Sequence, residues 1–440
     1  MRKFPASFLV AICFACSGAG SQYAAPPIAE LITELDAELP SVIANGNSPS
    51  IQVAVVHHDQ IIWSRAYGDS TSPDTVYMNA SVQKVFTATA ALQLMDQGLI
   101  NLDADINTYV PFAVRHPDFP EMPITVRMLL SHRSGLGSFD YQFAWDTESA
   151  FAPEYRQPCP KHLATMSQEE FIRASLAPEG ANFNPSAWFF EPDTRYHYSV
   201  SAFPFLRYLV SQVAEQSYAE YMQEHIFEPL GMTNSGFSAD EFAGRHATPF
   251  TRLDGENVEL PIWNGRGSMM HTTAEDMAKF MLAMMNDGRN GEFQLLQPET
   301  TQLMRKRTSQ FKVLFKISEE LQRKGHGLGL GVFRGGWYGF GGSAPGYQTL
   351  WRYNTSRKAG YVILSNVNAI LTGGENYPSA RSEIYEVQDA LISVLDPNYT
   401  VLRLRAAEIA LIGVYALLIM IWTRWRKAKR QKSPADQMHY

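Results

Sequence analysis

The stretch Ser81-Val82-Gln83-Lys84 opens an apolar segment that continues to Met95 without Gly or Pro. No charged residue follows Lys84 within this segment, which predicts a helix buried on nearly every side. A serine and a lysine three residues apart lie on one face of a helical turn, so the hydroxyl and the amine can meet. The amino terminus of a helix also favours a developing anion. The stretch therefore predicts a core helix that carries a serine nucleophile with a lysine base.

A second interpretation of these residues is purely structural. Ser81 would cap the helix and the Lys84 side chain would reach solvent, as such residues commonly do. Because serine-lysine spacing of this kind also occurs by chance in long chains, the motif needs support from other segments.

Strand patterns lie near both ends of the chain. Residues 53–56 and 61–68 flank His57-His58-Asp59-Gln60, which is the pattern of a hairpin. Three more strand patterns occur late, followed by a helical pattern; they cover residues 327–333, 348–353, 359–365 and 381–395. We therefore expect the two ends of the chain to build one antiparallel sheet flanked by helices.

The long middle of the chain is richer in helical patterns, such as residues 202–215 and 273–285. We expect it to form a mostly helical lobe, with the active site between this lobe and the sheet. Residues 140–186 mix Pro, Gly and aromatic residues irregularly and are a candidate insertion that faces the substrate. The polar run 305–324 predicts another surface loop or helix.

Two further segments support the serine-lysine motif: residues 124–136, which contain Ser131-His132-Arg133-Ser134-Gly135, and residues 227–232. With the serine helix, and in this order, they resemble the serine β-lactamase and penicillin-binding-protein superfamily. More narrowly, the chain resembles the class C β-lactamase-related branch, which includes family VIII carboxylesterases. The resemblance runs from about Ile51 to Leu395. It implies an α/β (α+β) fold with an antiparallel sheet flanked by helices and a mostly helical lobe.

Members of this superfamily use three active-site elements: the serine-lysine helix, a Tyr-x-Asn loop and a strand with Lys- or His-x-Gly. The chain keeps the first element. In the segment that matches the second, Tyr198 falls on the family's tyrosine and Val200 stands where asparagine is expected. In the segment that matches the third, Phe340 replaces the Lys or His, and Gly341 and Gly342 follow it.

These departures concern substrate binding more than the nucleophile. In the family the asparagine contacts the lysine and the substrate amide, and loss of one such hydrogen bond costs roughly 1–3 kcal/mol. Val200 therefore predicts altered specificity. The family's Lys or His recognises the substrate carboxylate of penicillins and D-alanyl peptides, whereas Phe340 is apolar. Because an unpaired carboxylate is costly to bury, the resemblance favours an uncharged ester or amide as substrate.

The resemblance also implies a mechanism. Ser81 would attack a carbonyl carbon, while Lys84 and Tyr198 together take up its proton and later deliver one to the leaving group. The N–H groups of Ser81 and Ser343 would form the oxyanion hole. Gly341 and Gly342 would let the strand approach the substrate closely.

Three functions remain open from the sequence. The first is a serine hydrolase that acts on carboxylic esters. The second uses the same chemistry on cell-wall peptides or β-lactams, as a D,D-peptidase or β-lactamase, and would need an arginine such as Arg266 or Arg352 to reach the cleft. The third is a catalytically impaired relative that binds a peptide, a cell-wall fragment or a partner protein. The sequence indicates neither the natural substrate nor the oligomeric state.

We expect neither a metal nor a cofactor. The eleven histidines include His57-His58, His116 and His326, but none shows the spacing of a zinc site. The chain also has no phosphate-binding Gly loop and no dinucleotide fingerprint.

The first nineteen residues have the pattern of a secretory signal. Met1-Arg2-Lys3 is followed by an apolar centre at residues 8–15 and by the small residues Ser17-Gly18-Ala19. We expect residues 1–19 to be removed on export, with lipid attachment at Cys16 as the alternative. Cleavage after Ala19 leaves Cys159 as the sole cysteine, which excludes an internal disulfide.

The carboxyl-terminal region has the pattern of a membrane anchor. Residues 406–423 are mostly apolar, which predicts a single transmembrane helix, although about 20 residues are usual; an interfacial helix is the alternative. Residues 424–440 would form a basic cytoplasmic tail. The hydrolase domain, residues 20–400, would then face the periplasm or the cell exterior.

Charge argues against nucleic acid as a partner. The chain has 37 Lys and Arg against 44 Asp and Glu, and its last forty residues hold eight of the basic and two of the acidic ones. The remaining part is therefore acidic, which disfavours binding to phosphate backbones. The expected partners are a small ester or amide substrate and the membrane.

Overall fold

The computed structural model describes residues 27–45, 48–68, 72–137, 166–253, 256–262, 269–310, 323–368, 378–396 and 420. The expected signal (1–19), the basic tail (424–440) and, apart from Met420, the expected membrane span (406–423) lie outside these residues. Within the described part of the chain, no helix is both long and apolar enough to span a bilayer.

An eight-stranded sheet, in which every pair of neighbouring strands is antiparallel, forms the centre of the molecule. Its order is β2-β1-β14-β13-β12-β11-β10-β9. The strands are β1 Ser50–His57, β2 Gln60–Gly68, β9 Ser309–Gln310, β10 Arg323–His326, β11 Gly331–Phe333, β12 Trp337–Ala344, β13 Tyr347–Asn354 and β14 Ala359–Ser365.

The two ends of the chain meet in this sheet, as the sequence predicted. The hairpin of β1 and β2 turns at His58 and Asp59, and β1 pairs with β14 in the register Val53↔Ile363. Every residue of β1 and of β14 is buried. Strand β1 is rich in β-branched residues, and β14 contains the apolar run from Tyr361 to Leu364, which suits a strand covered on both faces.

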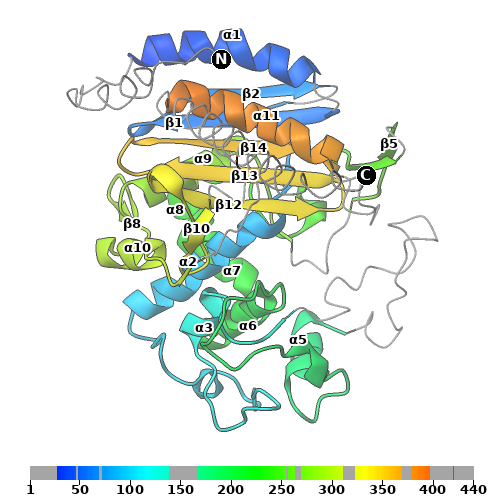
Figure 1. The fold of residues 1–440 in the computed structure, drawn as a ribbon, viewed down its shortest axis with the longest axis vertical. Helices are drawn as coiled ribbons and strands as arrows, with labels where there is room; N and C mark the ends of the chain where they lie inside the picture. The colour runs from blue at the N-terminus through cyan, green and yellow to red at the C-terminus, as the bar shows by residue number, and fades with distance from the viewer. Residues whose placement is uncertain are drawn as a thin grey trace, which may run out of the picture.

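The helices cover the two faces of the sheet and form a separate lobe (Figure 1). The helices are α1 Ile28–Asn45, α2 Gln83–Asp96, α3 Val126–Leu130, α5 Gln168–Leu176, α6 Ala202–Ala214, α7 Tyr218–Met222, α8 Glu228–Leu230, α9 Ala274–Met285, α10 Pro298–Arg305 and α11 Pro378–Leu395. Short two-stranded and three-stranded sheets join β3 Tyr77–Met78 to β6 His271–Thr272, β7 Arg289–Asn290 to β8 Phe293–Gln294, and β15 Val367–Asn368 to β4 Phe250–Leu253 and β5 Glu256–Glu259.

Two hydrophobic clusters hold these layers together. One face of the sheet packs with α1 and α11, where Val53, Ile363 and Leu391 are buried in one cluster. The other face packs with α2 and α9 in a larger cluster that extends into the helical lobe of α3, α5, α6 and α7. Helix α2 is buried at twelve of its fourteen residues, as its uncharged sequence predicted. Its amino terminus thereby lies between the sheet and the lobe.

The structure corrects three boundaries. The strand expected at residues 327–333 is shorter and covers only β11, because residues 327–330 form the turn between β10 and β11, in which Gly329 has φ +68°. The irregular segment 140–186 contains helix α5, which begins with a capping box between Ser167 and Glu170. The polar run 305–324 includes parts of α10, β9 and β10. Residues 138–165 and 311–322 lie outside the described part of the chain.

Candidate active site

Ser81 lies in a turn of 3₁₀-helix, η2 Ala80–Val82, that leads directly into α2. The sequence pattern placed Ser81 at the start of the α-helix, whereas in the structure the α-helix begins two residues later, at Gln83. Ala80 has φ +48°, a conformation that L residues rarely adopt and that is often found at active sites. The half-buried Ser81 is therefore presented on a strained turn at the amino terminus of a buried helix.

The structure brings the three predicted catalytic side chains together. Lys84 Nζ donates a hydrogen bond of 3.1 Å to Ser81 Oγ. Tyr198 Oη donates one of 3.2 Å to the same oxygen. The serine hydroxyl therefore has two groups within hydrogen-bond distance, each of which is a base in its deprotonated form.

Lys84 is buried, with 4% of its surface exposed. Its amine lies 5.3 Å from the ring centre of Tyr198 and 5.8 Å from that of Phe203. Within the described residues no carboxylate pairs with it, so Ser81 is its hydrogen-bond partner. The interpretation of Lys84 as a solvated surface residue is wrong.

Strand β12 carries the predicted oxyanion donor Ser343. Tyr347 and Ala344 flank the two-residue turn of the β12–β13 hairpin, and Ser343 pairs with Gln348. Hydrogen-bonded and non-hydrogen-bonded residue pairs alternate along an antiparallel hairpin, and the pair next to a two-residue turn is hydrogen-bonded. Ser343 and Gln348 therefore form a non-hydrogen-bonded pair, so the Ser343 N–H points away from β13. Strand β11 pairs with β12 only at Gly339 and Tyr338, so this part of β12 has a free edge among the described strands.

The same strand lies against the serine turn. A Cβ built on Gly342 would be 2.9 Å from the Ser81 nitrogen, which places the two backbones in close contact. The N–H of Ser81 and the free edge at Ser343 are thus on neighbouring segments. This arrangement fits the predicted oxyanion hole.

Phe340 occupies the position where a Lys or His was expected. Its ring centre lies 6.4 Å from that of Tyr198 and 5.8 Å from that of His326. The side chain is 6% exposed and belongs to the large hydrophobic cluster. Phe340 therefore packs in the core and at the same time places an apolar ring beside the candidate catalytic tyrosine.

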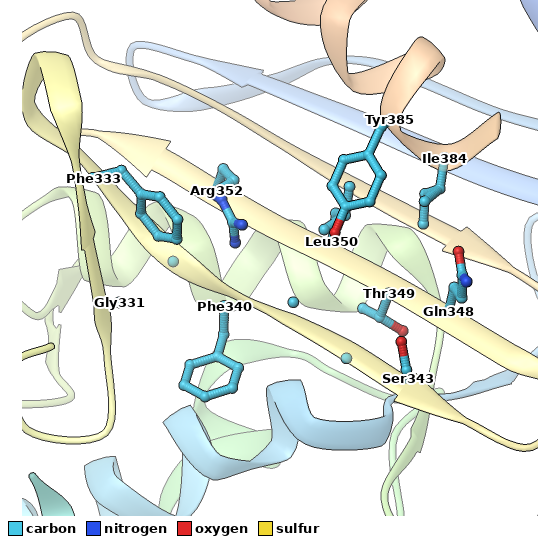
Figure 2. Close-up of a pocket in the computed structure, with 13 residues that line it drawn as sticks. Gly331, Phe333, Phe340, Ser343, Gln348, Thr349, Leu350, Arg352, Ile384 and Tyr385 are labelled. Carbon is cyan, nitrogen blue, oxygen red and sulfur yellow. The ribbon is translucent and has the colours of Figure 1, made fainter. Parts of the chain in front are cut away.

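Arg352 does not reach the cleft, which corrects one alternative. It pairs with Gly339, whereas Phe340 pairs with Trp351, so Arg352 lies on the opposite face of the sheet from Phe340. Figure 2 shows the two side chains on different sides of the strands, and the guanidinium lies 4.0 Å from the ring centre of Phe333. Arg266, the other candidate, lies outside the described residues.

A pocket of about 230 Å³ adjoins the Arg352 face of β12 (Figure 2). Its wall combines the backbone of β12 with side chains of β11, β13 and α11, among them Leu350, Arg352 and Tyr385. Gly339 and Gly341 contribute no side chains there, which is why the space is open. None of Ser81, Lys84 and Tyr198 lines it.

The remaining predicted residue, Val200, is half-buried in the Tyr198 loop, two residues before α6. Two residues near the site were missed as such. His132 and His326 are buried, and the His132 ring centre lies 4.6 Å from that of Tyr198 and 4.8 Å from that of His326. In the sequence, His132 was named only within residues 124–136 and His326 only among the eleven histidines. Only the fold brings the two side chains together.

In the described ranges, no three or more His, Cys, Asp and Glu side chains are grouped so that they could hold a metal ion.

Comparison with known proteins identifies the family and the fold. Residues 28–381 match the model of the Beta-lactamase family. Beta-lactamase-like protein 4 of Dictyostelium discoideum is 28% identical over 291 residues, which cover 60% of this chain and 47% of that protein. The chain thus spans about half the length of the curated relatives it matches.

Solved structures share the fold at low sequence identity. The octameric penicillin-binding protein homologue from Pyrococcus abyssi has a TM-score of 0.66 at 22% identity, over 83% of this chain and 77% of that one. EstCE1, a hydrolase with promiscuous acyltransferase activity, has a TM-score of 0.59 at 19% identity, over 83% of this chain and 99% of that one.

The fold is that of β-lactamase-like and penicillin-binding-protein-like serine hydrolases. This chain belongs to the Beta-lactamase family, because the family model covers most of its length.

Proposed function

We propose that the protein hydrolyses uncharged carboxylic esters through an acyl-enzyme formed on Ser81. The observation that carries the proposal is the pair of hydrogen bonds from Lys84 Nζ (3.1 Å) and Tyr198 Oη (3.2 Å) to one serine oxygen. A nucleophile with two candidate bases within reach is the arrangement that acyl transfer requires. A binding module would have no use for the three groups as a set.

The proposed reaction has two halves. Ser81 Oγ attacks the ester carbonyl carbon as its proton passes to the Lys84–Tyr198 pair, and the oxyanion is held by the N–H groups of Ser81 and Ser343. Collapse of the tetrahedral intermediate breaks the C–O bond, and the leaving alkoxide takes the proton. Water then attacks the acyl-serine with the same pair as base, which releases the carboxylic acid and restores Ser81.

Phe340 supports an uncharged substrate. Its ring lies beside Tyr198, where a cation would otherwise face a substrate carboxylate. Arg352 is on the opposite face of the sheet and does not replace that cation. Because burial of an unpaired carboxylate is costly, neutral esters are favoured over penicillins and D-alanyl peptides.

We also propose that the enzyme is exported and tethered to the membrane. The support comes from the signal pattern in residues 1–19 and from the apolar segment 406–423 with its basic tail, residues 424–440. The catalytic domain would then lie in the periplasm or outside the cell. Protease treatment of intact cells tests this proposal: the domain should be digested while the tail is protected.

The test of the activity uses the purified full-length chain and its Ser81→Ala variant. Each is exposed separately to a fluorophosphonate probe, a short-chain nitrophenyl ester and a penicillin, and intact mass is recorded with ester turnover. We expect a probe adduct and ester turnover that depend on Ser81, without a penicilloyl adduct. Circular dichroism and the melting temperature show that the variant is folded.

Other outcomes assign the alternatives. A Ser81-dependent penicilloyl adduct would favour a D,D-peptidase or β-lactamase and overturn the choice of neutral substrates. The absence of every adduct in folded wild-type protein would favour the binding module. Full ester turnover by Ser81→Ala would remove Ser81 from the mechanism.

A further inference from the structure

The loop that carries Tyr198 is fastened to the segment that follows α3. The Asp193 N–H donates to the Arg133 carbonyl at 2.8 Å, and the Ser199 hydroxyl donates to the Gly137 carbonyl at 2.7 Å. These contacts join two segments about sixty residues apart in sequence. They hold Asp193 and the Ser199 side chain, but neither bond holds the backbone amides on both sides of Tyr198.

His132 supplies that contact. Its backbone carbonyl accepts the His197 N–H at 2.8 Å, and its ring nitrogen Nδ1 accepts the Ser199 N–H at 3.0 Å. One residue thus binds the amides on either side of Tyr198. The Tyr198 ring centre lies 4.6 Å from the His132 ring. The backbone and the ring of Tyr198 are both placed by the same histidine.

The local conformation of His132 makes this double contact possible. Its φ of +56° lies in the left-handed region and follows the end of α3, so the carbonyl and the side chain can both face the Tyr198 loop. Because Nδ1 accepts a hydrogen bond, the neutral ring carries its proton on Nε2. The ring is buried, with centre-to-centre distances of 5.2 Å to Phe203 and 4.8 Å to His326.

We infer that His132 is a positioning residue that holds Tyr198 Oη against Ser81 Oγ through the Ser199 amide. The inference rests on the proposed function, in which Tyr198 moves a proton. Only 3.2 Å separates Tyr198 Oη from Ser81 Oγ, so a shift of the loop by about 1 Å would break the contact. A misplacement of this size can lower a rate by about 10²-fold.

Two variants separate the hydrogen bond from the packing of the ring. His132→Asn retains an acceptor, Oδ1, at the same distance along the side chain as Nδ1, and Asn tolerates the left-handed region. It loses the ring. His132→Phe retains a ring and loses the acceptor. If the hydrogen bond positions Tyr198, His132→Asn remains close to wild type in kcat while His132→Phe is slower by about 10²-fold.

A matched control is His116, which is also buried and accepts a backbone N–H, that of Asp118, on its Nδ1 at 3.1 Å. Its ring packs against Trp188 at 5.3 Å and touches none of the three candidate catalytic side chains. His116→Asn and His116→Phe should lower the melting temperature without a change in kcat. If the His132 variants lower kcat and the His116 variants do not, the loss of kcat is not a consequence of lower stability.

The experiment measures kcat and KM for a nitrophenyl ester, the rate of fluorophosphonate labelling and the melting temperature in full-length protein. The expected result is a selective loss of kcat and labelling rate in His132→Phe, with KM little changed. Equal rates in His132→Asn and His132→Phe, or a slower His132→Asn, would overturn the inference.

A second readout does not depend on activity. Hydrogen exchange, followed by mass spectrometry of overlapping peptides around Ser199, reports whether its amide is held. We expect faster exchange in His132→Phe than in His132→Asn. If wild-type protein neither hydrolyses esters nor reacts with the fluorophosphonate probe, the proposed function fails. The difference in hydrogen exchange between His132→Phe and His132→Asn still decides whether His132 holds the loop.

Discussion

Gly342 and Ser81 are in direct backbone contact, although they lie on different elements of the fold. A Cβ on Gly342 would stand 2.9 Å from the Ser81 nitrogen, from the Asn79 carbonyl oxygen and from the Ala80 Cβ. Real Cβ atoms essentially never come so close to backbone atoms. The glycine is therefore required by the approach of β12 to the serine turn.

Gly342→Ala should lower kcat strongly, because the added methyl group pushes β12 away from Ser81 and opens the oxyanion hole. Loss of one oxyanion donor typically lowers kcat by about 10²–10³-fold. The matched control is Gly341→Ala, whose Cβ would meet the flexible end of Leu350 at 3.3 Å and the Thr349 carbonyl oxygen at an ordinary contact distance of 3.9 Å. Steady-state ester kinetics of the two variants test this. Equal rates would show that the contact with Ser81 has no catalytic role.

Tyr198→Phe should lower kcat by about 10²–10⁴-fold, the usual contribution of a general acid or base. The change removes only the hydroxyl that bonds Ser81 Oγ, so KM and the melting temperature should change little. Kinetics with a nitrophenyl ester provide the measurement. A variant with wild-type kcat would leave Lys84 as the sole base.

Phe340→His should raise turnover of a carboxylate-bearing ester relative to its neutral methyl ester. The imidazole would provide a hydrogen-bond donor beside Tyr198, where the native ring is apolar. The measurement is the ratio of kcat/KM for the two substrates in both proteins. An unchanged ratio would contradict the role of Phe340 in the choice of substrate.

Acid should destabilise the protein through His271. This fully buried residue bonds His246 at 3.2 Å, and burial lowers its pKa to about 3. Above pH 6.5 both folded and unfolded states are neutral at this group. Between pH 6.5 and 3 only the unfolded state binds the proton, so the group lowers the unfolding free energy as pH falls, by up to about 1.4 kcal/mol per pH unit.

The measurement for His271 is the melting temperature from pH 8 to pH 4, in wild type and in His271→Gln. We expect a flatter pH dependence below pH 6.5 in the variant, because glutamine does not titrate. His246, whose pKa burial also lowers, contributes in the same direction and remains in both proteins. Parallel curves would assign the acid sensitivity to other groups.

Local patterns predicted much of the fold and the resemblance predicted the site. Helix α2 was predictable because its sequence is uncharged over three turns, and β1 because it is rich in β-branched residues. The placement of Arg352 could have been derived from strand alternation, since Tyr347, Thr349 and Trp351 share the other face. The capping pattern from Ser167 to Glu170 likewise indicated α5.

The role of His132 could not be predicted in this way. Its hydrogen bond to Ser199 spans 67 residues, and its left-handed conformation follows from the end of α3. Neither a periodic pattern nor a spacing rule brings two such residues together. The site depends on contacts between loops, which only the folded chain shows.

The pairing of β1 with β14 has a consequence for how the protein is made. Ile51 pairs with Ser365, so the first hairpin leaves the ribosome roughly 300 residues before its neighbour in the sheet. At about 5–20 residues per second, that interval is roughly 15–60 s. Throughout it the apolar strand β1 has one open edge, which is a hazard for aggregation. The nascent chain should therefore depend on holding chaperones, and premature termination before residue 359 should yield insoluble fragments.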